Sequence, residues 1–599
     1  MSRSAPLLAA LLFTVQPAQA QSAFPLAPLP TNRAWSGASE RLVAKKSDPW
    51  ITPSEASGFV DTPDYAATRA WLEKLVAASP LLRIESFGTS PDGRDLYYVR
   101  ASKKPPAGSP AKPVLLAQGG IHAGEIDGKD AGLMLLRDIA LRGKDGLLDK
   151  ADLVFVPIFN VDGHERSGAY SRPNQRGPRE QGWRTTSQNL NLNRDYLKAD
   201  APEMQAMIRL IEKLDPVLYL DLHVTDGADF QYDINMGFVG WEGWFARSPA
   251  IGRWLDSRFR PVIDADLKRA GHIPGLYVNA IDARDFDKGL VMEADKPRYS
   301  TGYGDARRLP TVLVELHSLK NYRQRVLATY VLVESSLKLV GDDAGPVRAA
   351  INADKALRPT EVTVRWKPRA APLYTIDFLG LAHDKVASVA SGRDEVRWLD
   401  RPITQKMPIF GDEPEVTVKL PRAWWVPASA TSVIDRLKLH GIAFETITAP
   451  KTLAVDMVRL VDPKLGIPDE GHVPLTAGFT HESRSETFPP GSVRVPADQP
   501  LSVLAAQLLE AESSDGALAW NFFPAILQRT EYMEAYVTAP MADAMLTADP
   551  ALKARFNAKL AADPAFAADA EARLAWFYEQ TPYADDRYLL YPVARELAR

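Results

Sequence analysis

Residues 113–142 read PVLLAQGGIHAGEIDGKDAGLMLLRDIALR, and this stretch contains the elements that decide the fold. Residues 113–118 form a short apolar run, as expected of a buried β-strand. Gly119 and Gly120 then favour a turn, and residues 128–142 have the periodicity of an amphipathic helix. Between the strand and the helix lie His122 and Glu125, two side chains that can bind a metal ion.

The same alternation of strand and helix continues along the chain. Further strands are expected over 82–87, 95–101, 152–159, 217–224 and 311–316, and further helices over 65–78, 202–213 and 322–339. Buried strands separated by helices are typical of an α/β domain with a largely parallel or mixed central sheet. In such sheets ligands bind beyond the carboxyl ends of the strands. The functional site is therefore expected on the loops that follow strands.

The composition is that of an ordinary soluble globular protein. Of the 599 residues, 46% are hydrophobic and 24% charged, which is ample for a sizeable core and several domains. The formal net charge is -4, from 71 basic and 75 acidic residues, so no global basic excess points to nucleic acid as a partner. The chain has no cysteine, so it has no disulfides, and any metal site must use His, Asp and Glu.

The N-terminus has the pattern of a secretory signal peptide. Arg3 is followed by an apolar run over 7–15 and by an Ala-x-Ala sequence that ends at Ala20. A short buried helix or a membrane anchor is the alternative, but the run is shorter than the ~20 residues that span a bilayer. We expect residues 1–20 to be cleaved and the protein to be exported, either to the periplasm or to the medium. No later segment of the sequence predicts a membrane span.

Composition divides the rest of the chain into three parts. Residues 21–61 are rich in Pro, Ser and Ala and are expected to form an irregular lead-in. The α/β domain is expected over 62–345, and the composition begins to shift near the end of this range. Residues 350–599 contain alternating, proline-rich stretches and then helical ones, which predicts a β-rich α+β C-terminal region. For the pair Trp424–Trp425 in that region, core packing is expected rather than a ligand-stacking surface.

Three expected strand ends carry residues with metal chemistry. His122 and Glu125 follow the first strand, and His223 lies near the end of the strand at 217–224. Two imidazoles and one carboxylate leave one tetrahedral position open, as in a catalytic zinc site. Glu315 ends another strand and is placed to act as a base. Each piece alone has a plainer interpretation, such as a core histidine, but their common position at strand ends favours one site.

In their order, the motifs resemble those of the zinc carboxypeptidase family, whose best-known member is carboxypeptidase A. The matching motifs are His122-Ala-Gly-Glu125, Asn160-Val-Asp-Gly163, Asn193-Arg194, His223 and Glu315. The resemblance covers roughly residues 62–340, and a match of all parts in order is far more specific than any one of them. It implies a carboxypeptidase-like domain with a central mixed sheet flanked by helices.

The resemblance also implies the roles of the metal-site residues. His122, Glu125 and His223 would bind one Zn²⁺ ion. Glu315 would take a proton from the attacking water and pass it to the leaving amine.

Substrate contacts follow from the same resemblance. Asn193 and Arg194 would hold the free carboxylate of a peptide substrate, and Arg184 would stabilise the oxyanion at the scissile carbonyl. An anionic substrate is also indicated by a cluster of arginines between residues 166 and 194. Its members are Arg166, Arg172, Arg176, Arg179, Arg184 and Arg194. For Arg172 and Arg179, surface ion pairs are the expected role.

The sequence departs from the family pattern at two points. Asn191 stands where members often have an aspartate that orients a metal-bound histidine. An amide can accept the same hydrogen bond, and Asp221 or Asp195 can supply a charged contact instead. The family also has a mobile tyrosine that closes over the substrate. Tyr299 and Tyr303 are the candidates, and we favour Tyr303.

Three hypotheses about function follow. The first is a zinc metallocarboxypeptidase that releases C-terminal residues, which the Asn193-Arg194 pair favours. The second keeps the metal chemistry in a zinc endopeptidase or amidase that acts on cell-wall or other specialised peptides. The third is a binding module with a degenerate site, which the presence of every expected catalytic residue disfavours.

Overall fold

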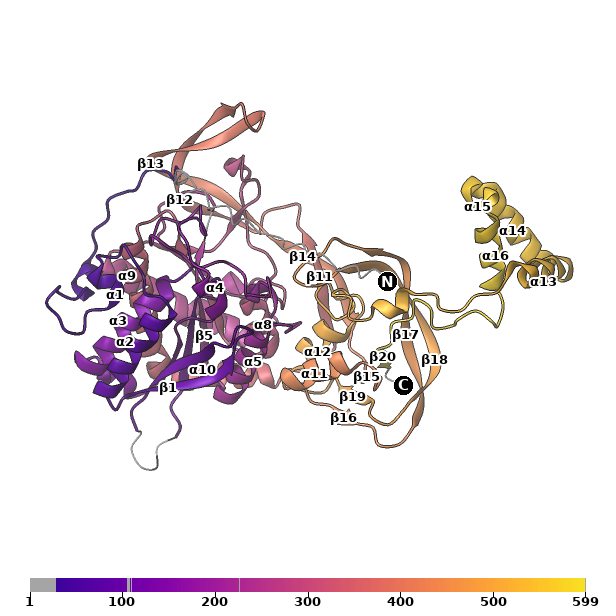
Figure 1. Ribbon diagram of the computed structural model, residues 1–599, viewed down its shortest axis with the longest axis horizontal. Coiled ribbons are helices and arrows are strands. Elements are labelled where there is room, and N and C mark those ends of the chain that lie inside the picture. Colours follow the sequence, from indigo (N-terminus) through magenta and orange to yellow (C-terminus); the bar gives the residue numbers. More distant parts are fainter. Residues whose placement is uncertain (1–27, 105–107, 109, 226, 598–599) are drawn as a thin grey trace, which may run out of the picture.

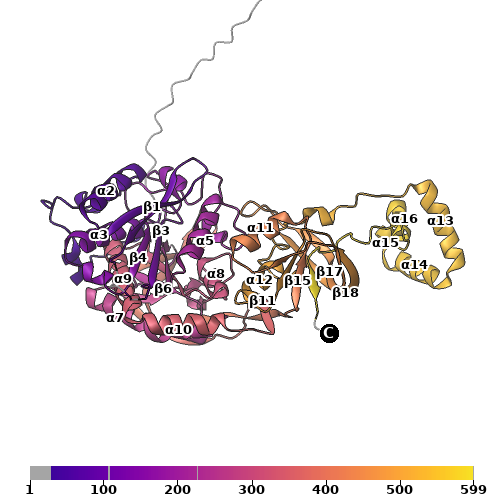
Figure 2. The same ribbon diagram turned by 90° about the horizontal axis from the view of Figure 1, so that it is seen from below.

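The computed structural model describes residues 28–104, 108, 110–225 and 227–597. An α/β domain, a β-rich domain and a small cluster of helices follow one another in a row (Figure 1). The view from below shows the β-rich domain between the other two (Figure 2). The expected signal peptide lies outside the described residues. Within the described part of the chain, none of the helices combines the length and hydropathy needed to cross a bilayer.

An eight-stranded sheet forms the centre of the α/β domain, in the order β1-β2-β4-β3-β5-β10-β6-β7. Its strands are β1 (Leu82–Thr89), β2 (Asp95–Ala101), β3 (Val114–Gly119), β4 (Asp152–Val156), β5 (Leu218–Thr225), β6 (Ile234–Gly237), β7 (Pro274–Leu276) and β10 (Thr311–His317). The inner strands β4, β3, β5 and β10 are parallel, whereas β1, β2 and β6 pair antiparallel with their inner neighbours. The predicted α/β class with a mixed central sheet is confirmed.

Helices cover both faces of this sheet. They are α2 (Tyr65–Ala78), α3 (Asp127–Leu141), α4 (Val161–Glu165), α5 (Pro202–Leu214), α6 (Pro249–Trp254), α7 (Arg260–Ala270), α8 (Ser300–Arg307), α9 (Tyr322–Asp342) and α10 (Ala344–Lys355). Successive side chains of a strand point to opposite faces, so β3 gives Leu115 and Ala117 to one core and Val114 and Leu116 to another. The first core includes α3, α7, α9 and α10, and the second includes α5 and α8.

The second core continues into the β-rich domain. Trp424, Val433 and Leu437 belong to the same buried cluster as the apolar sides of α5 and α8. Trp424 is fully buried and Trp425 nearly so, which confirms core packing for this pair. The two domains therefore share one apolar core on this side of the sheet.

The C-terminal region is β-rich, as predicted. One sheet pairs β11 (Glu361–Pro368) with β14 (Asp412–Lys419). Another has six strands, β16 (Glu445–Thr446), β19 (Val493–Pro496), β15 (Ala423–Val426), β20 (Ala594–Glu596), β17 (Lys451–Leu465) and β18 (Leu475–Phe488). The same domain contains the helices α11 (Thr431–Leu439) and α12 (Ser502–Leu509). The outlying helical cluster contains α13 (Ala535–Ala548), α14 (Pro550–Ala562), α15 (Pro564–Ala568) and α16 (Ala570–Tyr578).

The α/β domain extends past the expected end at residue 345. Val347 and Ile351 of α10 are buried in the first core. Pro346 lies in the first turn of α10, where a missing N–H is tolerated, so the proline-containing stretch begins a helix instead of a linker. The strands β12 (Tyr374–Ser388) and β13 (Arg393–Phe410) form a long hairpin that also contacts this domain. There β13 pairs with β9 (Leu290–Val291), and β9 pairs with β8 (Asn279–Ala280).

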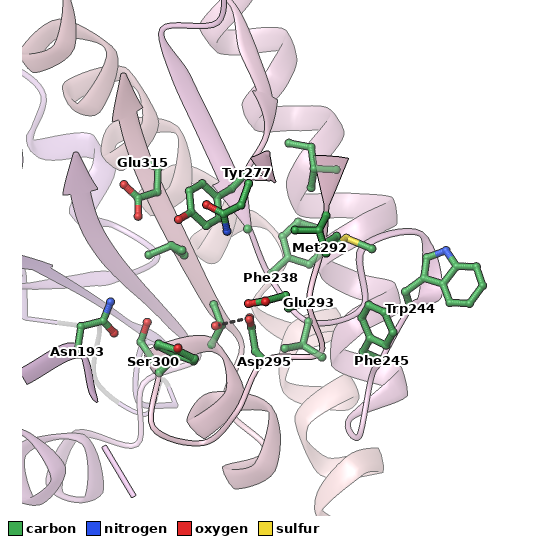
Figure 3. Close-up of a pocket in the computed structure, with 18 of the residues that line it drawn as sticks. Asn193, Phe238, Trp244, Phe245, Tyr277, Met292, Glu293, Asp295, Ser300 and Glu315 are labelled. Carbon is green, nitrogen blue, oxygen red and sulfur yellow. Dashed lines mark hydrogen bonds between the residues drawn. The ribbon is translucent and has the colours of Figure 1, made fainter. Parts of the chain in front are cut away.

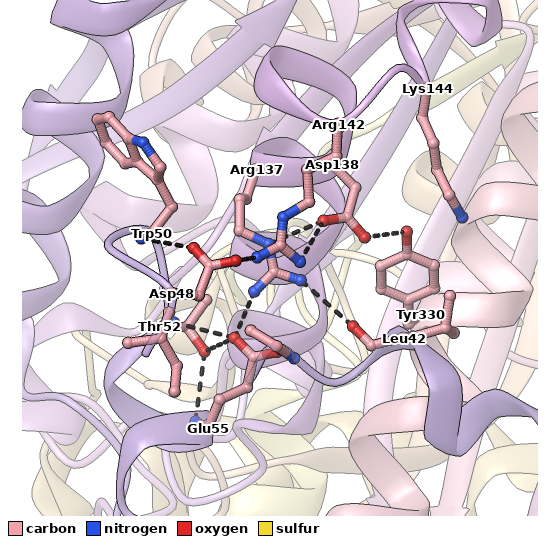
Figure 4. Close-up of polar contacts among 12 residues, drawn as sticks. Leu42, Asp48, Trp50, Thr52, Glu55, Arg137, Asp138, Arg142, Lys144 and Tyr330 are labelled. Carbon is pink, nitrogen blue, oxygen red and sulfur yellow. Dashed lines mark hydrogen bonds and ion pairs between the residues drawn. The ribbon is translucent and has the colours of Figure 1, made fainter. Parts of the chain in front are cut away.

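The described part of the lead-in is more ordered than its composition predicts. It contains the short helix α1 (Pro53–Ala56), which begins with a capping box between Thr52 and Glu55. Glu55 is buried and pairs with Arg137 of α3, which also contacts Asp138 (Figure 4). A buried ion pair thus connects the lead-in to the α/β domain. Composition could not reveal this contact, because Arg137 lies far from Glu55 in the sequence.

Candidate metal centre and substrate cavity

The turn after β3 brings two of the predicted ligands together. Gly120 has a φ of +70°, which favours glycine, and a Cβ at Gly119 would lie 3.1 Å from the carbonyl oxygen of Pro157. The backbone then closes a tight turn, in which the N–H of Glu125 donates to the carbonyl of His122 at 2.9 Å. Their side chains meet as a result, with His122 Nδ1 3.0 Å from Glu125 Oε1.

His223 and Glu315 come from neighbouring parallel strands. In the register between β5 and β10 they are direct partners. Partners on adjacent strands point to the same face of a sheet, which places the Glu315 carboxyl group beside the imidazole. The sequence predicted both as strand-end residues, and the parallel register explains why they meet.

His122, Glu125 and His223 form a compact and buried group of ligands. One ligand atom from each lies within 4.8 Å of the others, and Glu125 Oε2 is 3.0 Å from His223 Nδ1. Two imidazole nitrogens and a carboxylate oxygen are a donor set that suits a zinc ion with an open position. In the described part of the chain, no second group of His, Cys, Asp and Glu side chains has this geometry.

Asn191 fixes the orientation of the first imidazole. Its Oδ1 accepts a hydrogen bond from the backbone N–H of Asn193 at 3.0 Å, so this atom is an oxygen and not a nitrogen. The same Oδ1 lies 3.0 Å from His122 Nε2, which must therefore carry the proton and donate. Nδ1 is left with its lone pair toward Glu125 and His223. The uncharged amide thus performs the orienting role in which the family often uses an aspartate.

Asp221 orients the second imidazole. Its Oδ2 is 3.0 Å from His223 Nε2, which leaves Nδ1 toward Glu125. Burial lowers the pKa of His122 to about 4, so this ring is neutral and able to bind a metal. Burial acts in the same direction on His223, but Asp221 and Glu125 outweigh it and raise its pKa well above the usual range. Metal binding at His223 would therefore release a proton.

Two arginines contact the ligand carboxylate. Arg172 Nη2 is 2.8 Å and Arg184 Nη1 3.6 Å from Glu125 Oε1. The side chain of Arg172 is only 8% exposed, so the expected surface ion pair is wrong for this residue. It is confirmed for Arg179, which is 66% exposed and pairs with Asp61.

Gly124 explains how Arg172 reaches the metal site. A Cβ at Gly124 would lie 2.6 Å from Arg172 Cγ and 2.6 Å from the carbonyl oxygen of Gly182, so the arginine-rich loop packs directly on the turn. Nothing in the spacing of the arginines distinguishes Arg172 from its neighbours. The glycine next to a ligand was the one local sign that another segment comes close.

A cavity of about 320 Å³ opens next to the metal ligands. His122 and Glu315 line it together with the predicted substrate contacts Arg184, Asn193 and Arg194. All the predicted site residues except Tyr303 are therefore ligands of the triad or line this cavity.

Arg194 is held in place at the edge of the cavity. It lies in the short helix η3 (Leu192–Arg194), and its Nη1 donates to the carbonyl of Asn193 at 2.7 Å. Its guanidinium group also lies over the ring of Tyr299, 4.7 Å from the ring centre. These contacts position a cation where a substrate carboxylate could bind.

Tyr303 lies outside the cavity. It is 1% exposed in the second core, and its hydroxyl group is 3.0 Å from His440 Nδ1 of the β-rich domain. A side chain packed between two domains does not fit the role of a mobile residue that closes over substrate. Tyr299, the other candidate, lines the cavity, as does Tyr277, which the sequence did not single out.

The far part of the cavity combines apolar walls with two carboxylates. Phe238, Trp244 and Phe245 contribute to the walls. Glu293 and Asp295 lie between the Trp244–Phe245 pair and Glu315, with Phe238 beside Glu293 (Figure 3). The nearby cation is Arg247, whose Nη1 donates to the backbone carbonyl of Asp295 at 3.3 Å and forms its ion pair with Asp305. Burial raises the pKa of Asp295 to about 6, helped by the nearby charge of Glu293, while a hydrogen bond from Thr301 opposes the shift.

The α/β domain thus carries a buried His–Glu–His triad at its strand ends that could hold a metal ion. Residues 68–233 match the sequence model of the zinc carboxypeptidase family. We conclude that the α/β domain belongs to this family. By family and by its triad, the protein is a zinc metallopeptidase of the metallocarboxypeptidase type.

Individual relatives cover different shares of the chain. Carboxypeptidase 2 of Trichophyton rubrum is 23% identical over 427 residues, which are 68% of this chain and 73% of that protein. Carboxypeptidase Z of Gallus gallus is 31% identical over 121 residues, 18% of each chain. The crystal structure of carboxypeptidase A from Helicoverpa armigera aligns with a TM-score of 0.35 at 19% identity, covering 49% of this chain and 75% of that one.

Proposed function

We propose that this protein is a zinc-dependent carboxypeptidase that removes residues from the free C-terminus of peptides. The observation that supports it most is the cavity itself, in which Arg184 and Arg194 lie beside the triad and Glu315. Two cations in one cavity with a metal site suit a substrate that brings both a carbonyl oxygen and a terminal carboxylate.

The residues present fit a zinc ion, because two oriented imidazole nitrogens and one carboxylate converge and are buried. His122, Glu125 and His223 would hold it. When bound, the ion would polarise the scissile carbonyl and lower the pKa of the attacking water.

The other groups of the cavity act on the substrate. Glu315 accepts the proton of the attacking water on its carboxylate and returns it to the leaving amine. Arg184 donates hydrogen bonds to the carbonyl oxygen as negative charge develops there. Asn193 and Arg194 bind the terminal carboxylate and so place the last peptide bond beside Glu315.

The far part of the cavity favours a C-terminal lysine or arginine. Glu293 and Asp295 offer two carboxylates to a cationic side chain, whose aliphatic stem can pack on Phe238 and Met292. The site would then bind its substrate by opposite charges at its two ends, with arginines for the carboxylate and acids for the side chain.

Cleavage of paired peptides tests the exopeptidase activity. Peptides that end in lysine are offered with a free or an amidated C-terminus, and products are identified by mass spectrometry. We expect stepwise loss from the free acid only, abolished by a chelator and by Glu315→Gln. Internal cuts in both peptides would overturn the exopeptidase activity and favour the endopeptidase or amidase alternative.

The N-terminal sequence alone supports the further proposal that the enzyme acts outside the cytoplasm.

A further inference from the structure

The proposed substrate clamp, Asn193 and Arg194, lies in a segment that contacts the C-terminal domain. We call residues 190–200 the clamp segment, because it carries Asn191, Asn193 and Arg194. Several side chains from beyond residue 430 bind it. Arg436 donates to the carbonyl of Lys198 at 2.8 Å, and His440 Nε2 is 2.8 Å from the carbonyl of Leu197. The clamp segment is thus fixed from a domain that the family resemblance does not cover.

Glu470 contacts the residue that orients the proposed ligand His122. Its Oε2 accepts a hydrogen bond from the backbone N–H of Asn191 at 2.8 Å, across 279 residues of sequence. Asn191 in turn accepts from His122 Nε2 and from the backbone N–H of Asn193, each at 3.0 Å. One chain of hydrogen bonds therefore runs from Glu470 through Asn191 to a zinc ligand and to the clamp.

Glu470 occupies a position that does not suit a glutamate. It lies at the tip of the loop between β17 and β18, where Asp469 and His472 exchange hydrogen bonds of 2.8 and 2.9 Å around a two-residue turn. Both turn residues have positive φ, +47° for Glu470 and +83° for Gly471. Such turns favour Asn-Gly or Gly-Gly, and a residue with a large side chain there is strained. The turn alone gives no reason for a glutamate, whereas the bond to Asn191 does.

The tip of the loop is docked firmly enough to act on Asn191. A Cβ at Gly471 would lie 3.0 Å from the side chain of Leu190, so the turn packs directly on the clamp segment. His472 Nε2 is 2.8 Å from Asp200 Oδ2 at the other end of the segment, and its ring stacks on Phe522 with ring centres 5.1 Å apart.

A second contact from the C-terminal domain supports the cavity next to Tyr299, which lines it. Asp515 accepts from the backbone N–H and from Nε of Arg298, both at 2.6 Å. Arg298 directly precedes Tyr299, on whose ring Arg194 rests. The C-terminal domain thus holds both sides of the Arg194 site.

We propose that the C-terminal domain completes the active site, and that Glu470 is a positioning residue which acts through Asn191 on His122 and on the Asn193–Arg194 clamp. The proposal rests on the proposed function for the roles of the clamp and the ligands, but the contacts themselves do not depend on it. Partners that orient a ligand from behind change metal affinity or activity by about 10- to 100-fold when lost.

The test compares three variants of the full-length protein. Glu470→Gly removes the acceptor and suits the positive φ of the turn, so it keeps the loop folded. Glu470→Gln keeps an oxygen that can accept from Asn191. Glu482→Ala is the control, since Glu482 pairs with Arg459 and Arg484 inside the C-terminal domain. Each variant is measured for zinc affinity by chelator competition, for KM and kcat on a free-acid peptide, and for hydrogen exchange of the peptide that spans residues 189–195.

We expect Glu470→Gly to weaken zinc binding about tenfold, to raise KM about tenfold with a smaller change in kcat, and to speed exchange at the clamp segment. Glu470→Gln and Glu482→Ala should stay within about twofold of the wild type. If Glu470→Gly matches Glu482→Ala in zinc affinity, KM and exchange, the proposal is overturned and the contact is only packing.

Failure of the proposed function would look different. A wild-type protein that binds zinc but cleaves no peptide contradicts the carboxypeptidase activity. Zinc affinity and exchange would still show whether Glu470 acts on Asn191 and His122.

Discussion

The metal site and the proposed substrate clamp are neighbours in one cavity, yet they are held in different ways. The metal ligands come from the ends of β3 and β5, and the groups that orient them, Asn191 and Asp221, belong to the same domain. The clamp segment is bound by Glu470, Arg436 and His440 of the C-terminal domain. The backbone positions of the ligands and of Glu315 are therefore set by the α/β domain, whereas the clamp segment, which includes the orienting residue Asn191, is held by both domains.

The difference gives a physical reason for the role proposed for the C-terminal domain. A sheet fixes strand-end residues by its own ladder of hydrogen bonds, so parallel pairing alone brings Glu315 beside His223. A loop such as the clamp segment has no such ladder, and its backbone must be held by other contacts. The shared apolar core of the two domains provides a fixed base for those contacts.

The largest effect is expected from Glu315→Gln, which isolates the chemical step. Amide and carboxyl groups have nearly the same shape, but the amide cannot accept the proton of the attacking water. We expect kcat to fall by about 10²- to 10⁴-fold, with KM nearly unchanged. Steady-state kinetics measures both, and metal analysis should find the same zinc content as in the wild type. A variant that keeps more than about a tenth of kcat would show that another group is the base.

A smaller effect is expected at the clamp. Arg194→Ala removes a charged hydrogen-bond donor for the terminal carboxylate, which is worth about 1.5–3 kcal/mol. The value of kcat/KM on free-acid peptides should fall about 10- to 100-fold, mainly through KM. Arg179→Ala is the matched control, because Arg179 lies 66% exposed on Asp61 and should leave the kinetics unchanged. An equal loss in both variants would contradict the clamp.

The smallest effect is expected in the far part of the cavity and depends on pH. The pKa of Asp295 is raised to about 6 by burial, so this group is charged above that pH and takes up a proton below it. As pH falls through 6, KM for a lysine-terminated peptide should rise about fivefold, the size expected from losing an ion pair worth ~1 kcal/mol.

A leucine-terminated peptide is the control for that pH profile, because it brings no cation to Asp295. The ratio of the two KM values removes any effect of pH on the metal ligands. In Asp295→Asn the ratio should no longer change between pH 5 and 7. A ratio that still changes in the variant would assign the effect to another group.

Much of the α/β domain could be predicted from the sequence because its elements are regular. The helix over 65–78 and the strand over 95–101 have the predicted bounds, since apolar periodicity and turn residues mark both ends. The strand expected over 152–159 ends earlier, at Val156, because Pro157 cannot donate to the sheet. Expected bounds were least accurate where long-range packing decided them, as with α10.

Some residues of the candidate site could also be predicted from the sequence, and others could not. His122, Glu125, His223 and Glu315 were predicted from their common position at strand ends together with the order of the family motifs, since each residue alone has a plainer interpretation. Arg172 could not be separated from other arginines of its loop, because its role depends on how that loop folds onto Gly124. Glu470 lies 279 residues from its partner, and only a structure reveals such a contact.

Tyr303 is a predicted site residue that the structure places in the core. The family resemblance made Tyr303 a candidate for the mobile tyrosine, but its neighbours Gly302 and Gly304 lie within α8 and allow close packing. A Cβ at Gly304 would lie 2.1 Å from Thr311 Oγ1. The same residue type in the same stretch therefore serves the core at Tyr303 and the cavity at Tyr299.

The most direct test of the central claim is a crystal structure of the zinc-loaded protein with the product lysine bound. We predict that the lysine carboxylate contacts Arg194 and Asn193 and that its ammonium group lies beside Asp295 and Glu293. A lysine bound with its carboxylate away from Arg194, or with its side chain directed out of the cavity, would contradict the assignment of the clamp and of the acidic pocket.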